Sequence, residues 1–214
     1  MIAVTGIGYI DRHCFSMLNA AMRRDYENIK EIYQYMKDNA ILTGPIKNFG
    51  RFDYESKRVC LTAGLSLHDA KIFNDSATDD IGIVMSNKDG SLFANCDYFK
   101  DYIACGRTLG RGNLFIYTLP TSPLAETAIC YHLNGPLLYT SRVDNCAALA
   151  LEQAKSIVEY NEANAMLAIA GTQNDLVCFV VEKARNRDTS RLTDIKDLIQ
   201  SLNGDNDMVL SKVL

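Results

Sequence analysis

Two residues with nucleophilic side chains, Asp144 and Cys146, lie where an apolar run gives way to a helical pattern. Pro136–Ser141 follows a glycine and is apolar with aromatic and β-branched residues, which predicts a strand. From Ala147 through Val158 the apolar residues recur at helical spacing, which predicts a helix. A short polar side chain at such a strand-to-helix bend occupies the place where many enzymes carry a nucleophile.

Each of these residues also has a purely structural interpretation. Asp144 is a good N-cap residue, because its carboxylate can accept free backbone N–H groups and offset the positive end of the helix. Cys146 lies in the predicted first turn, where the helix dipole lowers the pKa of a thiol, but a buried thiol beside Ala147 and Ala148 is the commoner arrangement.

Length, composition and charge restrict the class of protein. The chain has 214 residues with 48% hydrophobic content, enough for one substantial core. Its net charge of −4 provides no field that attracts nucleic acid or an anionic membrane, so neither is expected as a partner. We find no run of 18 apolar residues and no basic region with an apolar run at the N-terminus, and we therefore expect a cytoplasmic protein.

Cysteine and histidine usage argues against metals and disulfides. The seven cysteines are an odd number and include no CxxC pair, which is typical of reduced and mostly buried thiols. His13, His68 and His132 are far apart in the sequence and form no metal-binding motif. We expect no metal and no cofactor.

The remaining pattern predicts an α/β fold with a mixed five-stranded sheet, mostly parallel with one antiparallel edge strand, and helices on both faces. We expect Gly6 and Gly8 to form a turn after the first strand, and residues 87–112, with Arg107 and Arg111, to form a surface loop. The expected strands are 2–6, 81–86, 136–141, 165–172 and 176–184. The expected helices are 16–39, 54–71, one that begins at Ser122 and is buried, 147–158, and about 193–202.

Several segments together resemble the N-terminal half of a β-ketoacyl synthase of the thiolase-like fold. The opening IAVTGIGYI is similar to the family's first strand, and YESKRVCLTAGLSLHDAKI is similar to the helix that ends in an Ala-Leu-x-Asp-Ala-Gly pattern. LFIYTLPTSPLAETAICYHLNGP resembles the segment that runs through a small-residue helix to a terminal Gly-Pro. The resemblance covers about residues 1–184, and it is weak across residues 87–112.

The alignment of the bend decides what the resemblance implies. In the family the nucleophilic cysteine lies eight residues after the proline of Gly-Pro, with small residues six and ten positions later. Counting from Pro136 gives Asp144, and the two later positions are Ala150 and Ala154. Cys146 comes two positions too late, so an aspartate replaces the family's cysteine.

The resemblance therefore implies a catalytically silent subunit, similar to a chain-length factor, in fatty-acid, polyketide or polyene biosynthesis. An acyl-aspartate is a mixed anhydride, a poor carrier for condensation, and the sequence ends before the region of the family's two catalytic histidines and lysine. We expect no catalytic residue. We expect a ketosynthase-like domain over residues 1–184 and a helical tail over 185–214.

The partner is expected to be a ketosynthase-like subunit or a second copy of the chain. In this family the strand before the nucleophile lies at the sheet edge, so we expect pairing through Leu137, Leu138, Tyr139, Thr140 and Ser141. An acyl carrier protein is a further expected partner, which Arg107 and Arg111 could contact. Two alternatives stay open: a weak acyltransferase or thioester-processing enzyme that uses Cys146, with His132 as its base, and one half of a split synthase.

Overall fold

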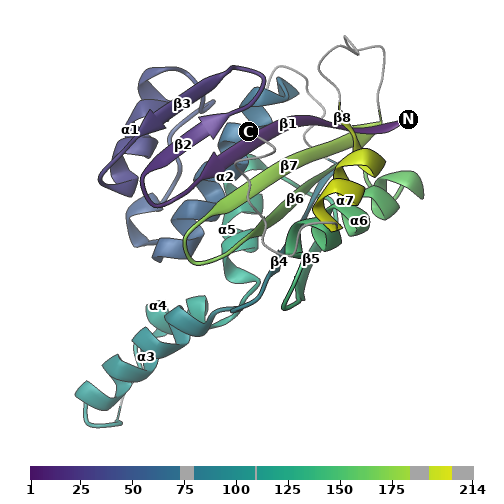
Figure 1. Cartoon of the computed structure of the whole chain (residues 1–214). Coiled ribbons are helices and arrows are strands. Elements are labelled where there is room, and N and C mark those ends of the chain that lie inside the picture. Colours follow the sequence, from purple (N-terminus) through teal and green to yellow (C-terminus); the bar gives the residue numbers. More distant parts are fainter. Residues whose placement is uncertain (73–79, 109, 184–192, 204–214) are drawn as a thin grey trace.

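The computed structural model describes residues 1–72, 80–108, 110–183 and 193–203. A twisted sheet forms the centre of the molecule, helices cover both of its faces, and an arm of two helices projects from one end (Figure 1). The expected α/β class with helices on both faces is confirmed.

The described part of the sheet has eight strands. Seven follow the order β3-β2-β1-β7-β6-β4-β5, and β8 pairs with β1 beside this path. Among the described strands, β4 pairs in parallel with β5 and β6, and every other pair is antiparallel. The strands are β1 (Ile2–Ile10), β2 (Cys14–Met17), β3 (Met22–Asp25), β4 (Ile81–Asn87), β5 (Leu137–Ser141), β6 (Ala165–Gly171), β7 (Leu176–Lys183) and β8 (Thr193–Asp194).

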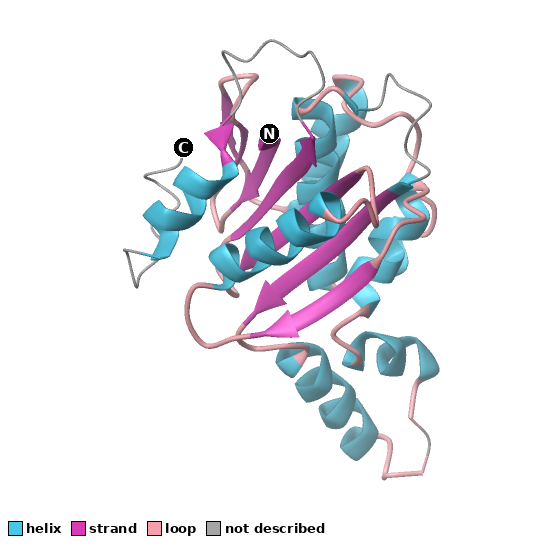
Figure 2. Cartoon of the chain, turned by 90° about the vertical axis from the view of Figure 1, so that its right-hand side faces the viewer, coloured by secondary structure: helices cyan, strands magenta, loops and turns pink. Residues whose placement is uncertain are grey.

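Helices form a layer on each side of this sheet (Figure 2). Helices α1, α2 and α5 pack on one face, α6 and α7 cover the other, and α3 and α4 form the arm. Their bounds are α1 (Ile29–Asp38), α2 (Tyr54–Asp69), α3 (Leu92–Ala104), α4 (Gly112–Phe115), α5 (Ser122–Tyr131), α6 (Cys146–Glu159) and α7 (Ile195–Asn203), with 3₁₀ turns η1 (Phe49–Arg51) and η4 (Ile116–Thr118).

The central strands are apolar on both faces, because a helix layer covers each face. In β6, Leu167 and Ile169 point into the core shared with α2, whereas Met166 and Ala168 point into the core shared with α6. Strand β4 is buried along its whole length, as expected for a strand in the centre of a sheet.

Helix α2 lies unusually close to β1, and two glycines make this approach possible. A Cβ atom on Gly6 would lie 2.5 Å from the backbone oxygen of Ser66, and one on Gly8 would lie 2.4 Å from that of Thr62. The strand continues through both glycines to Ile10, so the expected turn at Gly6 and Gly8 is wrong. These glycines serve close helix–strand packing.

The carboxylate of Asp69, at the end of α2, fixes the neighbouring chain. It accepts backbone N–H groups from Ile7 at 2.9 Å, Asn19 at 3.2 Å and Ala20 at 3.0 Å. Desolvation raises the pKa of this carboxyl, and the three N–H donors oppose that shift. The contact joins α2, β1 and the β2–β3 turn.

The expected sheet was wrong in strand number and in direction. The observed sheet has more than five strands and is mostly antiparallel. Residues 16–25, expected to be the start of a helix, lie in the hairpin of β2 and β3, which extends the sheet beyond β1. Residues 29–38 are helical as the apolar stripe predicted. The four-residue segments Cys14–Met17 and Met22–Asp25 are too short to show a periodicity that distinguishes a strand from a helix.

Two further expectations changed in the structure. Residues 92–104 form helix α3 in place of a loop, although none of its residues is buried. Helix α5 is buried only on the side that faces α2, and Ile129 is 70% exposed.

Helix α7 confirms the helix expected near residues 193–202, and Ile195 and Leu198 pack into the α6 core. The expected boundary between residues 184 and 185 lies outside the described residues.

We predict that Gly6→Ala lowers the free energy of unfolding by about 2 to 3 kcal/mol, because the new methyl group meets the α2 backbone, which cannot yield as a flexible side chain can. Chemical denaturation measures the change. Gly44→Ala is the matched control, since nothing lies within 4 Å of the added Cβ, and we expect a change within about 0.5 kcal/mol. Equal stability of the two variants would contradict the close-packing role.

Candidate functional site

The carboxyl ends of three neighbouring strands meet at one end of the sheet. Because β4 is parallel to both β5 and β6, the pairing places Asn87 beside Ser141 on one side and Gly171 on the other. Ligands in α/β sheets bind preferentially beyond the carboxyl ends of such strands. The strand-to-helix bend, the β6–β7 turn and the base of the arm all lie here.

The bend between β5 and α6 has its left-handed residue at Asn145, with φ 55° and ψ 40°. Asn145 is also the N-cap residue of α6, and its side chain accepts no capping hydrogen bond. Asp144 precedes it and is exposed, and within the described chain its carboxylate has no hydrogen-bond partner. The interpretation of Asp144 as the N-cap is therefore wrong.

Cys146 is the first residue of α6, and its thiol donates to the backbone oxygen of Arg142 at 3.2 Å. The candidate base His132 lies beyond the opposite end of β5. The five residues of that strand span about 16 Å at 3.3 Å per residue, so the fold does not bring the two side chains together. Ala150 and Ala154, the small residues counted from the bend, are fully buried against the sheet.

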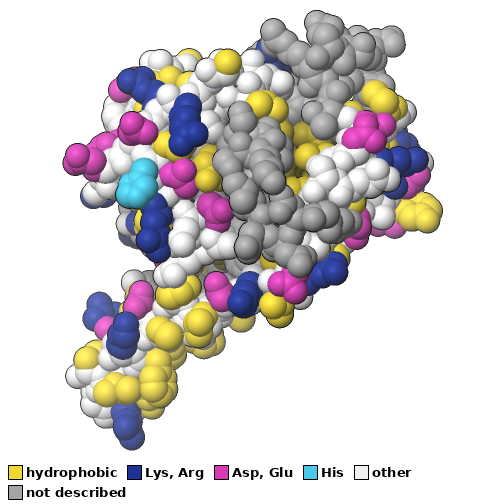
Figure 3. Space-filling model, viewed as in Figure 1, with side chains coloured by type: hydrophobic (Ala, Val, Ile, Leu, Met, Phe, Trp, Pro, Cys, Tyr) yellow, Lys and Arg dark blue, Asp and Glu magenta, His cyan; other side chains and the backbone are white. Residues whose placement is uncertain are grey.

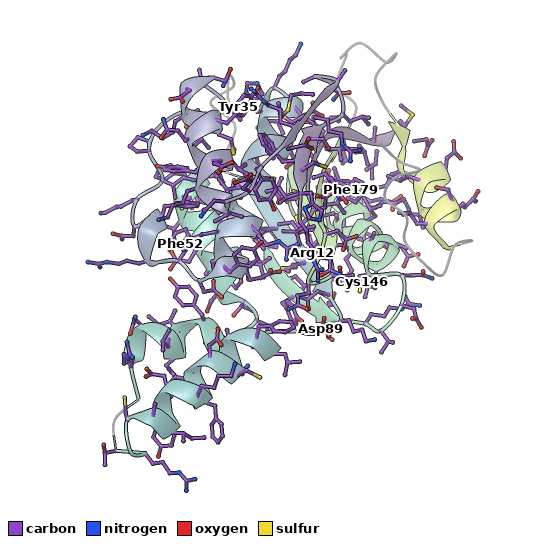
Figure 4. All side chains as sticks on the ribbon, turned by 60° about the vertical axis from the view of Figure 1, so that its left-hand side comes forward. Arg12, Tyr35, Phe52, Asp89, Cys146 and Phe179 are labelled. Carbon is purple, nitrogen blue, oxygen red and sulfur yellow. The ribbon has the colours of Figure 1, made fainter. Side chains whose placement is uncertain are left out.

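A pocket of about 430 Å³ opens next to the bend, between the base of the arm and the body. The α2 N-terminus and the β6–β7 turn form its body side, and α3, α4 and the following turn form its arm side. Figure 4 shows Arg12, Asp89 and Cys146 close to the base of the arm. The residues that line the pocket include Arg12, Asp53, Tyr54, Glu55, Arg58, Asn87, Asp89, Phe93, Asp97, Tyr117, Thr172 and Gln173.

Sequence reasoning did not find this pocket. Its walls come from five separate segments, and no segment carries a recognisable motif. The one local signal is Asn87-x-x-Gly90 at the end of a buried strand, a spacing typical of a tight turn. Residues 87–112 were expected to be a loop, so the wall that α3 provides could not be foreseen.

The base of the arm is fixed by Asn87. Its Oδ1 atom accepts the backbone N–H of Gly90 at 2.8 Å and the hydroxyl of Tyr139 at 2.7 Å. Gly90 has φ +59°, a conformation that favours glycine. Burial raises the pKa of the Tyr139 hydroxyl, with smaller contributions from the charges of Cys146, Asp89 and Glu55. Tyr139 therefore links β5, the bend and the pocket.

Arg58 forms part of the pocket wall and is only 2% exposed. Its guanidinium lies 3.1 Å from a carboxylate oxygen of Glu55 and donates to the backbone oxygens of Gln173 at 3.0 Å and Thr172 at 3.3 Å. This one side chain holds the β6–β7 turn against the first turn of α2. The positive charge of Arg58 is therefore paired within the protein.

The other charges of the pocket are mostly acidic. Burial raises the pKa of Asp53, whose carboxylate caps α2 by accepting the N–H of Ser56 at 2.9 Å, and the negative charge of Asp97 adds to the increase. Burial also raises the pKa of Glu55, although Arg58 opposes this. Among the described residues we find no cluster of three or more side chains that could hold a metal ion.

Strand β5 lies at the edge of the sheet, with β4 as its one described neighbour. Leu137 and Leu138 are each 39% exposed, Tyr139 and Thr140 are half-buried, and Ser141 is exposed. Ile129 of α5 and Val143 of the bend add two more exposed apolar side chains nearby in the chain. Among the described helices, none is long and apolar enough to cross a membrane.

The arm also exposes apolar side chains, which Figure 3 shows gathered along its length. Phe99 of α3 is 60% exposed, and Phe115 and Ile116 are more than half exposed. Arg111 forms an ion pair with Asp101 within the arm, so it is not a free phosphate-binding group.

No protein-family model and no curated protein matches this chain significantly. Solved structures do share its fold. An ishigamide ketosynthase/chain length factor matches with TM-score 0.60 and 11% sequence identity, and the match covers 87% of this chain and 63% of that chain. A β-ketoacyl synthase from Burkholderia phymatum matches with TM-score 0.60 and 14% sequence identity, and the match covers 86% of this chain and 59% of that chain.

A third similar structure is a ketosynthase in complex with its chain length factor from Xenorhabdus doucetiae. It matches with TM-score 0.52 and 14% sequence identity, and the match covers 77% of this chain and 76% of that chain. The chain spans about three fifths of the first two structures. It has the thiolase-like fold of the ketosynthase-like proteins, as the sequence resemblance implied.

We predict that Arg58→Met lowers the free energy of unfolding by about 3 kcal/mol, because Glu55 and two backbone oxygens lose their donor. Without the guanidinium the pKa of Glu55 rises further, because its buried charge has lost its partner. The loss in free energy of unfolding is therefore larger at pH 7, where Glu55 is charged, than at pH 4.5, where Glu55 takes up a proton. Denaturation at both pH values measures it. Arg51→Met, at an exposed position, is the control, and an equal loss there would show that the clamp is unimportant.

Proposed function

We propose that this chain is a non-condensing, ketosynthase-like subunit of the chain-length-factor kind that acts by pairing with a ketosynthase-like protein or with a second copy of itself. The observation that carries the proposal is the apolar edge at β5, which has β4 as its one described neighbour, next to the bend where the family resemblance places Asp144. The pathway class is the assembly of fatty-acid, polyketide or polyene chains, and the cytoplasm is the expected compartment.

The bend supports the silent role. Asp144 stands at the aligned position and is exposed, and among the described residues no cation or backbone N–H pairs with its carboxylate. Condensation needs donors directed at the thioester oxygen and imidazoles near the nucleophile. Within the described residues, His132 lies at the far end of β5, and no described hydrogen bond joins His13 or His68 to the bend.

The sheet edge supports pairing. A strand with an open side offers unpaired N–H and C=O groups to another strand, and exposed apolar residues at such an edge are a liability unless a partner covers them. Antiparallel pairing of two β5 strands about a two-fold axis would join the sheets and cover Leu137 and Leu138. The apolar arm projects from the same end of the sheet, so it can extend the buried area.

The proposal includes an acyl carrier protein as a transient partner of the complex, because the proposed partner processes carrier-bound chains. Arg107 is an exposed cation at the end of the arm, where it can meet an acidic helix. Arg111 is less available because Asp101 pairs with it.

We predict that the chain is dimeric, or bound to a ketosynthase-like protein, and that Leu138→Lys reduces it to a monomer. The lysine places a charge in the centre of the proposed strand pair, where no counter-charge is described. Light scattering after gel filtration at micromolar concentration measures the mass. Co-purification from the native host separates a hetero-complex from a homodimer and would also detect the missing half of a split synthase.

Tyr160→Lys is the matched control for this experiment. Tyr160 is 76% exposed at the end of α6, away from the sheet edge, so the same charge change there should leave the assembly intact. A wild-type chain that is monomeric and co-purifies alone would overturn the pairing proposal.

A second candidate function rests on the position of Cys146, the first residue of α6, beside the strand-to-helix bend. Acylation would proceed by attack of the thiolate on an acyl thioester, with release of the donor thiol and retention of the acyl group on Cys146. The thiol donates to the oxygen of Arg142 and has no described base, which favours the silent role.

Incubation with octanoyl-coenzyme A followed by peptide mass spectrometry tests this candidate. Under the silent-subunit proposal, Cys146 acquires no more label than the exposed Cys96 and Cys105, which serve as internal controls. Stable acylation of Cys146 that is lost in Cys146→Ala would refute the silent role.

A further inference from the structure

The pocket at the base of the arm carries a charge imbalance that the proposed function does not use. Four carboxylates line it, from Asp53, Glu55, Asp89 and Asp97, against the guanidiniums of Arg12 and Arg58. Arg58 is neutralised by Glu55 and by two backbone oxygens. Arg12, Asp89 and Asp97 all lie at exposed positions, so water screens the charge of each, and four carboxylates still face two guanidiniums.

Two of these carboxylates come from opposite walls. Asp53 belongs to the body, at the N-cap of α2, and Asp97 belongs to α3 of the arm. Their like charges interact across the pocket, which is one reason why the pKa of Asp53 is raised, after burial itself. The nearest described cation to Asp97 is Lys100, 3.6 Å away on the exposed side of the same helix, and that pair is worth little.

The remaining lining is apolar and aromatic. The rings of Tyr54, Phe93 and Tyr117 line the same pocket as the carboxylates. Aromatic faces attract cations and also accept the apolar body of a ligand. A volume of about 430 Å³ lies in the range of small-molecule sites.

We infer that this pocket binds a small organic ammonium ion with an apolar body, whose charge lies between Asp97 of the arm and Asp53 of the body. The carboxylates supply the field, the rings supply the contact area, and the bound cation relieves the repulsion between the two walls. Occupancy would therefore hold the arm against the body. A metal ion fits less well, since no described cluster of three ligands exists.

Three probes of nearly equal shape and different charge test the inference on the full chain at pH 7.5: 2-phenylethylammonium, 2-phenylethanol and phenylacetate. Isothermal titration calorimetry should show saturable one-site binding of the ammonium ion, at least about tenfold tighter than the alcohol, and no binding of phenylacetate.

Isosteric variants locate the site. Asp97→Asn and Asp53→Asn should each weaken binding of the ammonium ion about threefold to tenfold. Asparagine is a good N-cap, so the second variant retains the start of α2, and Asp97 is exposed, so the first retains the fold. Asp38→Asn on the remote helix α1 makes the same change in net charge and should leave affinity within about twofold.

The inference is overturned if the alcohol or phenylacetate binds as tightly as the ammonium ion. It is equally overturned if the pocket variants match Asp38→Asn, which would mean unspecific attraction to an acidic protein. These measurements use the chain alone and do not depend on its assembly, so their failure leaves the proposed pairing untouched, and failure of the pairing leaves them interpretable.

Discussion

The parallel pairing of β4 with both β5 and β6 is the constraint on which the rest of the site depends. It brings the carboxyl ends of three strands to one end of the sheet, and with them the bend, the β6–β7 turn and the base of the arm. It also leaves β5 outermost, with β4 as its one described neighbour. The pairing of β4 with its two neighbours therefore produces both the pocket end of the sheet and the edge strand β5. Tyr139 of β5 connects the two through its hydrogen bond to Asn87, which lines the pocket.

Helix α2 anchors this end of the molecule through two kinds of contact. Backbone proximity at Gly6 and Gly8 fixes its distance from β1, and polar groups at its two ends fix its orientation. Asp69 accepts N–H groups from β1 and from the β2–β3 turn, while Arg58 reaches the β6–β7 turn. The first turn of this helix, which Arg58 joins to the β6–β7 turn, forms the body side of the pocket.

The bend shows how far residue counting can go. Strand β5, helix α6 and the small residues Ala150 and Ala154 follow directly from the apolar pattern and the Gly-Pro turn. The cap does not follow, because Asp144 and Asn145 are both good N-cap residues and a one-residue difference in where the chain turns decides between them. Residues 92–104 were mistaken for a loop because an exposed helix buries no face and so produces no apolar stripe.

The sequence by itself determined the strands and helices that carry a continuous apolar signal and the resemblance to ketosynthase-like proteins, since each depends on residue type and local spacing. Tertiary structure alone decided the direction of most strand pairs, the hairpin of β2 and β3, the separation of His132 from Cys146 and the acidic pocket beside the arm. These features join segments far apart in the chain, and the energy of such contacts depends on three-dimensional packing that no local pattern encodes.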